Sequence, residues 1–199
     1  MPIPKDIKEI TYLAKGKRGV IYTGILKGEK VSIKKKHPDS EAIGRIKNEA
    51  NFLKILNKYK IGPELIRTGK DYLVYIYVEG VFLPEFLKKE KNNERKNKVL
   101  INILKQARIL DKLKINKLEF TRPLKHVFVK YPKVVIIDFE RSYYTKNPKN
   151  VTQFCQYLIK GNYMKNNLKV FKNYKENQTE KNFKEILKLI KEKRKVKLL

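Results

Sequence analysis

The feature that most constrains the fold of this 199-residue chain is a change in the spacing of its hydrophobic residues. Residues 10–14, 19–26 and 29–35 are short segments rich in β-branched and aromatic residues, separated by turns that contain glycine. They predict three strands, and Lys27-Gly28 is typical of a hairpin turn between the last two. Over residues 40–58 the hydrophobic residues instead recur every three or four positions, which predicts an amphipathic helix.

The remainder of the chain continues this order. Gly62-Pro63 ends the predicted helix, and two further strands are predicted over residues 64–68 and 72–78. From Phe82 onward the pattern is mainly helical, with a small hairpin expected around Tyr131-Pro132. We therefore expect a single α+β domain: residues 1–78 form a five-stranded sheet with an inserted helix, and residues 79–199 form a helical part that ends in a basic tail.

The net charge of the chain is unusually high. Lys and Arg number 48 against 20 Asp and Glu, which gives a formal charge of +28. Such an excess attracts polyanions at low salt, so RNA or a ribosomal particle is a candidate partner. The lysines are spread along the whole chain without an arginine cluster or interleaved aromatic residues, so a uniformly lysine-rich solvated surface explains the charge equally well.

Several classes of protein are excluded by composition. The single cysteine, Cys155, excludes an intramolecular disulfide framework and a zinc site built from several thiolates. The first residues lack the apolar core of a signal peptide, and the longest apolar run, residues 72–78, is too short to span a bilayer. We expect a soluble cytoplasmic protein that does not associate with membranes.

Three residue types in the first part suggest a phosphate site. Gly16 and Gly19 flank a turn, and glycine turns let backbone N–H groups approach phosphates closely. Lys34 ends a predicted strand, from which its ammonium can reach a nucleotide phosphate. Glu49 lies beside the apolar stripe of the predicted helix, where an acid needs a cation, and Lys34 is the natural partner. The alternatives are an ordinary hairpin turn and a solvated surface lysine.

A second acid follows a buried strand further along. Asp138 comes directly after four β-branched residues, 134–137, where a carboxylate is costly unless a cation or strong hydrogen bonds accompany it. Mg²⁺ is the obvious candidate cation, and a turn or helix N-cap is the alternative role. Tyr77 and Glu79 lie in a segment, 75–80, whose backbone could pair with the edge of an adenine ring.

Taken in order, these motifs resemble those of the minimal, atypical protein kinases of the RIO and Bud-type group, and most closely the small predicted serine/threonine kinases of archaea. The likeness is carried by Ile33-Lys34, Asn48-Glu49-Ala50, Gly62-Pro63, Val78-Glu79-Gly80 and Ile137-Asp138-Phe139-Glu140. It implies a two-lobed protein-kinase-like fold with a five-stranded N-lobe and a reduced helical C-lobe. It also implies binding of ATP and Mg²⁺, with Lys34 and Asp138 in catalytic roles. The Bud-type kinase is a subunit of the KEOPS tRNA-modification assembly.

The chain departs from this kinase pattern in its catalytic loop. Neither His-Arg-Asp nor His-Gly-Asp occurs, and Glu119 is the only acid in the corresponding segment, where it would act as the catalytic base. His126 stands near the position of the metal-binding asparagine, and Arg122 or Lys125 could contact the γ-phosphate. Glu140 replaces the glycine that usually follows Asp-Phe.

Three functions are therefore compatible with the sequence. The first is an ATP-dependent atypical serine/threonine kinase or ATPase that transfers the γ-phosphate of Mg-ATP. The second is a nucleotide-binding, pseudokinase-like module that docks RNA, a ribosomal particle or a tRNA-modification complex. The third is a small-molecule kinase, for which the roughly 60 residues after Asp138 leave little room to build an acceptor pocket.

Overall fold

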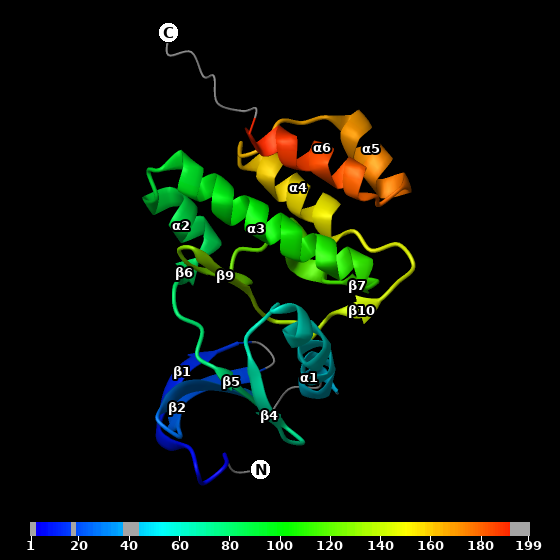
Figure 1. Ribbon diagram of the computed structural model, residues 1–199. Coiled ribbons are helices and arrows are strands. Elements are labelled where there is room, and N and C mark those ends of the chain that lie inside the picture. The colour runs from blue at the N-terminus through cyan, green and yellow to red at the C-terminus, as the bar shows by residue number, and fades with distance from the viewer. Residues whose placement is uncertain (1–2, 17–18, 38–43, 192–199) are drawn as a thin grey trace. The chain divides into compact units, whose positions relative to one another are not determined.

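The computed structural model describes residues 3–16, 19–37 and 44–191, in a mixed α+β arrangement (Figure 1). It contains a five-stranded antiparallel sheet and, in this described part, six α-helices. The chain divides into two compact units. The first runs to Gly80 and also includes Val135–Ser142, and the second contains Val81–Val134 and the residues from Tyr143 onward. The segment 135–142 thus returns to the first unit after the chain has entered the second.

The sheet of the first unit confirms the five predicted strands. It has the order β1-β2-β3-β5-β4, and all four strand pairs are antiparallel. The turn between β2 and β3 is the two-residue hairpin expected at Lys27-Gly28, with both residues at positive φ (51° and 83°). The strands are β1 (Lys8–Lys15), β2 (Gly19–Leu26), β3 (Glu29–Lys36), β4 (Leu65–Thr68) and β5 (Tyr72–Ile76).

Strand β3 lies at the centre of the sheet and is covered on both faces. Four successive residues, Val31–Lys34, are buried, although side chains alternate between the two faces of a strand. Val31 and Ile33 belong to a hydrophobic cluster on one face. Helix α1 (Arg45–Leu56) packs against β4 and β5, and its Leu53 and Leu56 are fully buried. The expected start of this helix, residues 40–43, lies outside the described residues.

The second unit contains the remaining helices and three short strand pairings. Its helices are α2 (Leu83–Lys89), α3 (Asn93–Lys112), α4 (Asn150–Lys160), α5 (Leu168–Glu176) and α6 (Glu180–Lys191). Strands β6 (Val81–Phe82), β8 (Val127–Lys130) and β9 (Lys133–Ile136) form a sheet in that order, and the last two residues of β9 are counted with the first unit. Strand β7 (Ile115–Asn116) pairs with β10 (Tyr143–Tyr144). The hairpin predicted around Tyr131-Pro132 is thereby confirmed. The expected basic tail, residues 192–199, lies outside the described residues.

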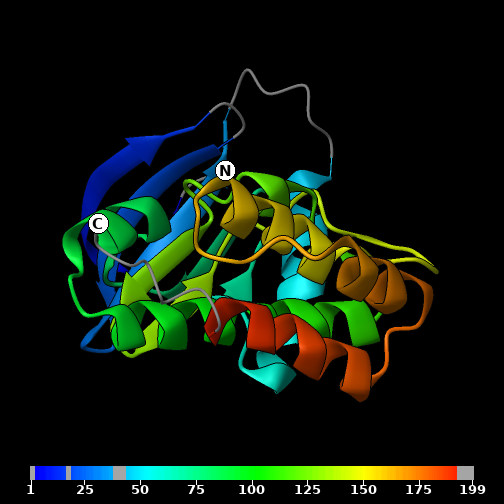
Figure 2. The ribbon, with the colours of Figure 1, turned by 90° about the horizontal axis from the view of Figure 1, so that it is seen from above.

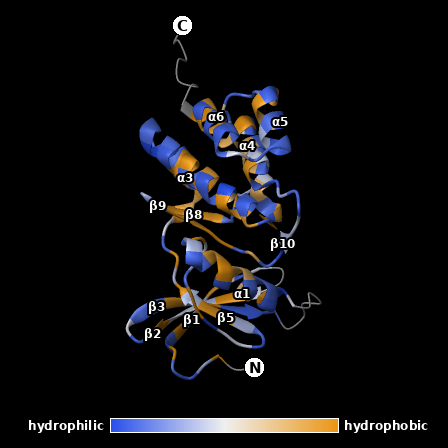
Figure 3. Cartoon of the chain, turned by 45° about the vertical axis from the view of Figure 1, so that its right-hand side comes forward, coloured by the Kyte–Doolittle hydropathy of each residue, from blue (hydrophilic) through white to orange (hydrophobic). Residues whose placement is uncertain are grey.

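Helix α3 organises the second unit. It packs against α4 and α6, and α6 runs alongside it in both views (Figures 1 and 2). These helices carry both hydrophobic and hydrophilic residues (Figure 3), and Ile103, Leu104 and Leu110 of α3 are fully buried. Asn92 caps α3 by accepting hydrogen bonds from the backbone N–H groups of Glu94 and Arg95, which explains why the helix begins at residue 93. No helix in the described part of the chain is long and apolar enough to cross a membrane.

A buried carboxylate lies inside this helical unit. Asp111 is fully buried, and its Oδ1 accepts hydrogen bonds from the backbone and side-chain nitrogens of Asn150 (3.0 and 2.7 Å). Its Oδ2 accepts one from the Tyr174 hydroxyl (2.9 Å). Burial raises the pKa of Asp111, and these hydrogen bonds oppose the rise. Asp111 therefore joins α3 to α4 and α5, which is a structural role.

We expect Asp111→Ala to lower the free energy of unfolding by about 3 kcal/mol or more, because buried donors that lose their acceptor cost roughly 1–3 kcal/mol each. Urea unfolding followed by circular dichroism measures the change. Glu176→Ala, which removes an exposed acid of α5, is the matched control and should change stability by less than about 0.5 kcal/mol. Equal losses in the two variants would contradict a structural role for Asp111.

Candidate functional site

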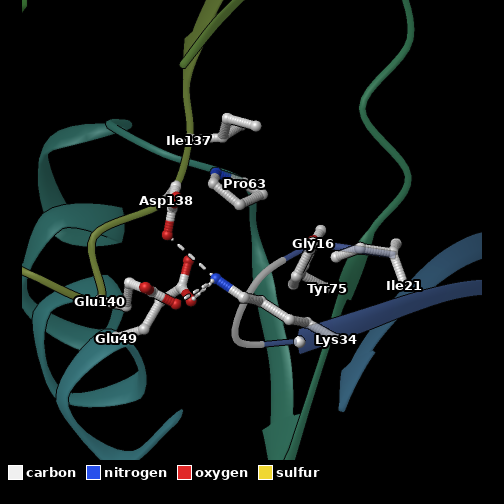
Figure 4. A pocket seen from close by; sticks show the side chains of 10 residues that line it. Gly16, Ile21, Lys34, Glu49, Pro63, Tyr75, Ile137, Asp138 and Glu140 are labelled. Atoms are coloured by element: carbon white, nitrogen blue, oxygen red, sulfur yellow. Dashed lines mark hydrogen bonds and ion pairs between the residues drawn. The ribbon is translucent and has the colours of Figure 1, made fainter. Parts of the chain in front are cut away.

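Lys34 is the centre of the candidate site. It lies on β3, paired with Ile21 of β2 and Leu73 of β5, and its side chain is only 10% exposed. Its Nζ donates hydrogen bonds to carboxylate oxygens of three acids: Glu49 Oε2 at 2.6 Å, Asp138 Oδ1 at 3.0 Å and Glu140 Oε2 at 3.1 Å (Figure 4). The predicted pairing of Lys34 with Glu49 is therefore present in the structure.

Glu49 is held by contacts on both of its carboxylate oxygens. It lies on the buried side of α1, next to Ala50 and close to Leu53, and the residue is 2% exposed. While Oε2 accepts from Lys34, Oε1 accepts a hydrogen bond from the backbone N–H of Phe139 at 3.3 Å. Both contacts satisfy a carboxylate that would otherwise be costly to bury.

The two other acids lie on a short segment that α1 holds in place. The backbone of Asp138 has a positive φ of 65°, a conformation that aspartate tolerates better than most residues. The side-chain amide of Asn48 donates hydrogen bonds to the carbonyl oxygens of Glu140 and Ser142, both at 3.0 Å. The guanidinium of Arg45 also donates to the Glu140 carbonyl, at 3.4 Å. These contacts place the carboxylates of Asp138 and Glu140 next to Lys34.

A cavity of about 170 Å³ lies beside these charged groups (Figure 4). The backbone N–H of Gly16 donates to the Gly19 carbonyl at 2.8 Å, which closes the predicted glycine turn at the rim. A Cβ atom at Gly19 would lie 3.1 Å from the Lys35 carbonyl oxygen and 3.5 Å from Lys34 Cε, so glycine lets the turn approach the lysine. The cavity is lined by Gly16, Gly19, Ile21, Lys34, Glu49, Pro63, Tyr75, Ile137, Asp138 and Glu140.

The charges of the site are unbalanced, because the described residues that line the cavity include three acids and one cation. Burial by itself lowers the pKa of the Lys34 ammonium, but the three carboxylates outweigh it and hold that pKa well above its ordinary value of 10.5. Burial raises the pKa of the Glu49 carboxyl above its ordinary value of 4.5, against the opposing effect of Lys34. With all four groups ionised, the cluster carries two excess negative charges.

This donor set suits a divalent cation. Glu49, Asp138 and Glu140 each offer an oxygen atom, and these three oxygens all lie within 4.8 Å of one another. Mg²⁺ and Ca²⁺ prefer oxygen ligands, at about 2.0–2.1 Å and 2.3–2.6 Å respectively, so oxygens this close to one another are candidate ligands of one ion. A divalent charge would also balance the two excess negative charges of the cluster.

Two residues predicted to bind the nucleotide base lie elsewhere in the first unit. The backbone N–H of Tyr77 donates to the Lys30 carbonyl at 3.0 Å, and the Lys30 ammonium lies 4.2 Å from the centre of the Tyr77 ring. Glu79 is exposed, next to Gly80 with a φ of 125°. Neither Tyr77 nor Glu79 is among the described residues that line the cavity at Lys34.

The residues predicted for the catalytic loop belong to the second unit. Glu119 lies in the 3-10 turn Leu118–Thr121, and its Oε2 accepts a hydrogen bond from the buried ammonium of Lys117 at 3.1 Å. Arg122 and Lys125 are exposed, and His126 is the last residue of the turn that precedes β8. Within the described residues, His126 belongs to no group of three or more metal-binding side chains. The roles of these four predicted residues remain predictions.

Two residues of the site were not predicted from the sequence. Glu140 was noted only as a replacement for glycine, although its carboxylate faces Lys34 and its side chain is 7% exposed. The available signal was its spacing: Glu140 follows Asp138 by two residues, and two acids so close after a buried strand favour a shared cation. Asn48 gave no local signal, because its partners lie 92 and 94 residues away in the chain.

Compared with known proteins, the chain matches no protein-family model, and a search of the curated proteins finds no significantly similar sequence. The case for a functional site therefore depends on the geometry of Lys34 and its three carboxylates.

We expect Lys34→Met to destabilise the protein by about 3–5 kcal/mol at neutral pH, because it leaves buried carboxylates without their cation. The loss should be much smaller below pH 4.5, the ordinary pKa of a glutamate. Lys34 opposes the rise that burial causes in the pKa of Glu49, so its removal raises that pKa further. A carboxyl group whose pKa is raised by folding contributes stability below its unfolded pKa and loses that contribution as the pH rises through its folded pKa. The cost of removing Lys34 therefore appears as the pH rises. Urea unfolding in the presence of EDTA at several pH values measures both quantities.

Lys35→Met is the matched control for this experiment. Lys35 follows Lys34 on β3, so its side chain projects from the opposite face of the sheet. Its replacement should cost little stability at any pH. A Lys34→Met variant with a loss that does not depend on pH would contradict the ion-pair account of the site.

Proposed function

We propose that this protein is an ATP-dependent phosphotransferase of the atypical serine/threonine-kinase type, or an ATPase, and that its first unit binds Mg²⁺ and ATP. The observation that carries the proposal is the position of Lys34. Its ammonium contacts Glu49 of α1 and Asp138, at the wall of a cavity whose lining includes Gly16 and Gly19. A lysine fixed by a helix glutamate, beside a metal-binding aspartate, is the arrangement that phosphoryl transfer by kinases requires.

Each residue of the site has a distinct part in this proposal. Lys34 supplies the positive charge that offsets a nucleotide phosphate, and Glu49 holds its side chain in position. Asp138, whose side chain is 31% exposed, is the most accessible of the three acids and offers its carboxylate to Mg²⁺. Bound Mg²⁺ would neutralise the negative charge that develops on the phosphates during transfer.

The size of the cavity indicates which part of the nucleotide it would hold. A volume of about 170 Å³ is close to that of a cavity that holds one aromatic ring, roughly 150 Å³. It accommodates a phosphate group or two and not a whole ATP molecule. We therefore assign the cavity to the phosphates, and the base and ribose would extend beyond it. Glu119 stays in the proposal as the acid that orients or deprotonates the acceptor hydroxyl.

We expect Asp138→Asn to weaken binding of Mg-ATP at least about tenfold, because the variant keeps the shape of the side chain and removes the charge that attracts the cation. Isothermal titration calorimetry measures the affinity. Asp71→Asn, in the turn between β4 and β5, is the matched control and should bind like the parent protein. Unchanged Mg-ATP affinity in Asp138→Asn would contradict the site, and absence of binding by the parent protein would contradict the function.

A second candidate function is RNA binding, which one surface of the second unit favours. A hollow of about 680 Å³ is lined by Lys114, Tyr144, Thr145 and Lys146. The Tyr144 side chain is 61% exposed, and both lysines are exposed as well. Aromatic rings stack on unpaired bases and lysines attract the phosphate backbone, so this surface suits single-stranded RNA. The net charge of +28 favours the same class of partner.

We expect Tyr144→Ala to weaken binding of a single-stranded RNA oligonucleotide about five- to hundredfold at physiological salt, since stacking of one base contributes roughly 1–3 kcal/mol. Fluorescence anisotropy of a labelled RNA measures the affinity. Tyr12→Ala is the matched control, because Tyr12 of β1 is exposed to a similar extent, 59%. Equal affinities in the two variants, with a steep decline in both as salt rises, would leave only non-specific attraction by the lysines.

A further inference from the structure

The hydrogen-bonding capacity of Lys34 is fully used. An ammonium group has three N–H donors and no acceptor. The Lys34 ammonium donates to Glu49, Asp138 and Glu140 at 2.6, 3.0 and 3.1 Å, one hydrogen bond to each acid (Figure 4). A phosphate oxygen can therefore accept a hydrogen bond from Lys34 only if one of the three carboxylates gives up its own.

Glu140 cannot simply swing away into solvent. The residue is 6% exposed, and its carbonyl oxygen accepts hydrogen bonds from the side chains of Asn48 and Arg45, which both belong to helix α1. Phe139, the residue before it, is fully buried and its N–H is bound by Glu49. The backbone that carries Glu140 is thus fixed on both sides. The carboxylate itself is held by its ion pair with Lys34, at 3.1 Å.

The charge of the cluster also opposes an incoming phosphate. Among the described residues, three carboxylates surround the one Lys34 ammonium, and the Asp138 side chain is partly exposed. A nucleoside triphosphate is itself strongly negative, and like charges repel most strongly where little water screens them. Without a divalent cation, the site therefore presents to the nucleotide a lysine whose three donors are bound by carboxylates.

We propose that Glu140 acts as a metal-dependent lock on Lys34: the ammonium becomes available to a phosphate only when a divalent cation draws the Glu140 carboxylate away. The inference rests on the proposed function of nucleotide binding and adds a positioning role for a residue outside that proposal. The cation would enter beside Asp138, the most exposed of the acids, and would reach the Glu140 oxygen nearby. Glu49, with the shortest hydrogen bond, would keep its hold on Lys34.

The experiment compares nucleotide affinity with and without metal in the parent protein and in Glu140→Gln. Isothermal titration calorimetry measures the dissociation constant of the non-hydrolysable ATP analogue AMP-PNP in EDTA and in excess Mg²⁺. We expect the parent to bind at least about tenfold more weakly in EDTA, as the loss of a charge-assisted hydrogen bond implies. Glu140→Gln should bind more tightly than the parent in EDTA, because its neutral amide oxygen holds the Lys34 ammonium less strongly than a carboxylate does, and because the variant removes one negative charge.

Glu29→Gln is the matched control, since it makes the same chemical change at an exposed position of β3. It should show the metal dependence of the parent. A Glu140→Gln variant that binds AMP-PNP with the same ratio of affinities as the parent would overturn the lock and leave the nucleotide site standing. Absence of AMP-PNP binding by the parent in both conditions would overturn the proposed function and the lock together.

A second variant and a second probe guard against a folding defect. Glu140→Asp keeps the charge but shortens the side chain by one methylene, so its carboxylate should hold Lys34 less well and the ratio of affinities should fall below that of the parent. Mn²⁺ alone, titrated into the protein and followed by electron paramagnetic resonance, reports metal binding without nucleotide. Glu140→Gln should bind Mn²⁺ more weakly than Glu29→Gln, and equal Mn²⁺ affinities would overturn the part of Glu140 in metal binding.

Discussion

The interaction on which the site depends is the contact of one buried ammonium with three carboxylates. Lys34 joins β3 to Glu49, 15 residues away, and to Asp138 and Glu140, 104 and 106 residues away. Buried ion pairs add little net stability, because the charges lose their hydration, but they are costly to break once formed. The hydrophobic residues of β3 and α1 therefore stabilise the first unit, and the charged cluster determines which groups face each other within it.

Helix α1 explains how groups so distant in the chain are aligned. Two successive residues, Asn48 and Glu49, contact the same returning segment: Asn48 binds the carbonyl oxygens of residues 140 and 142, and Glu49 binds the N–H of Phe139. The buried leucines of the same helix pack it against the sheet that carries Lys34. A single rigid helix thus positions both the lysine's strongest partner and the backbone of its two other partners.

The sequence allowed the parts with a local signal to be predicted. Short segments rich in β-branched and aromatic residues indicated the five strands, and Lys27-Gly28 indicated the hairpin between β2 and β3. An acid beside an apolar stripe indicated the pairing of Glu49 with Lys34. Strands of two residues, such as β7 and β10, are too short for any periodicity. The structural role of Asp111 depends on hydrogen bonds from Asn150 and Tyr174, which lie 39 and 63 residues away in the chain. No residue near Asp111 in the sequence indicates these partners. The kinase-like motif has glycine at the position of Glu140 and so gives no role for a charge there; the role depends on Lys34, 106 residues away.

The return of residues 135–142 to the first unit has a consequence for biosynthesis. At roughly 5–20 residues per second, the ribosome needs about 5–20 s to add the hundred or so residues that separate Lys34 from Asp138 and Glu140. During that interval Glu49 is the only one of the three acids that has been synthesised, so Lys34 has no other partner in the cluster. Only after residue 142 has emerged can Asn48 bind its carbonyl partners and the two further acids arrive. The amino-terminal unit is therefore completed late, after the whole of helix α3 has been synthesised.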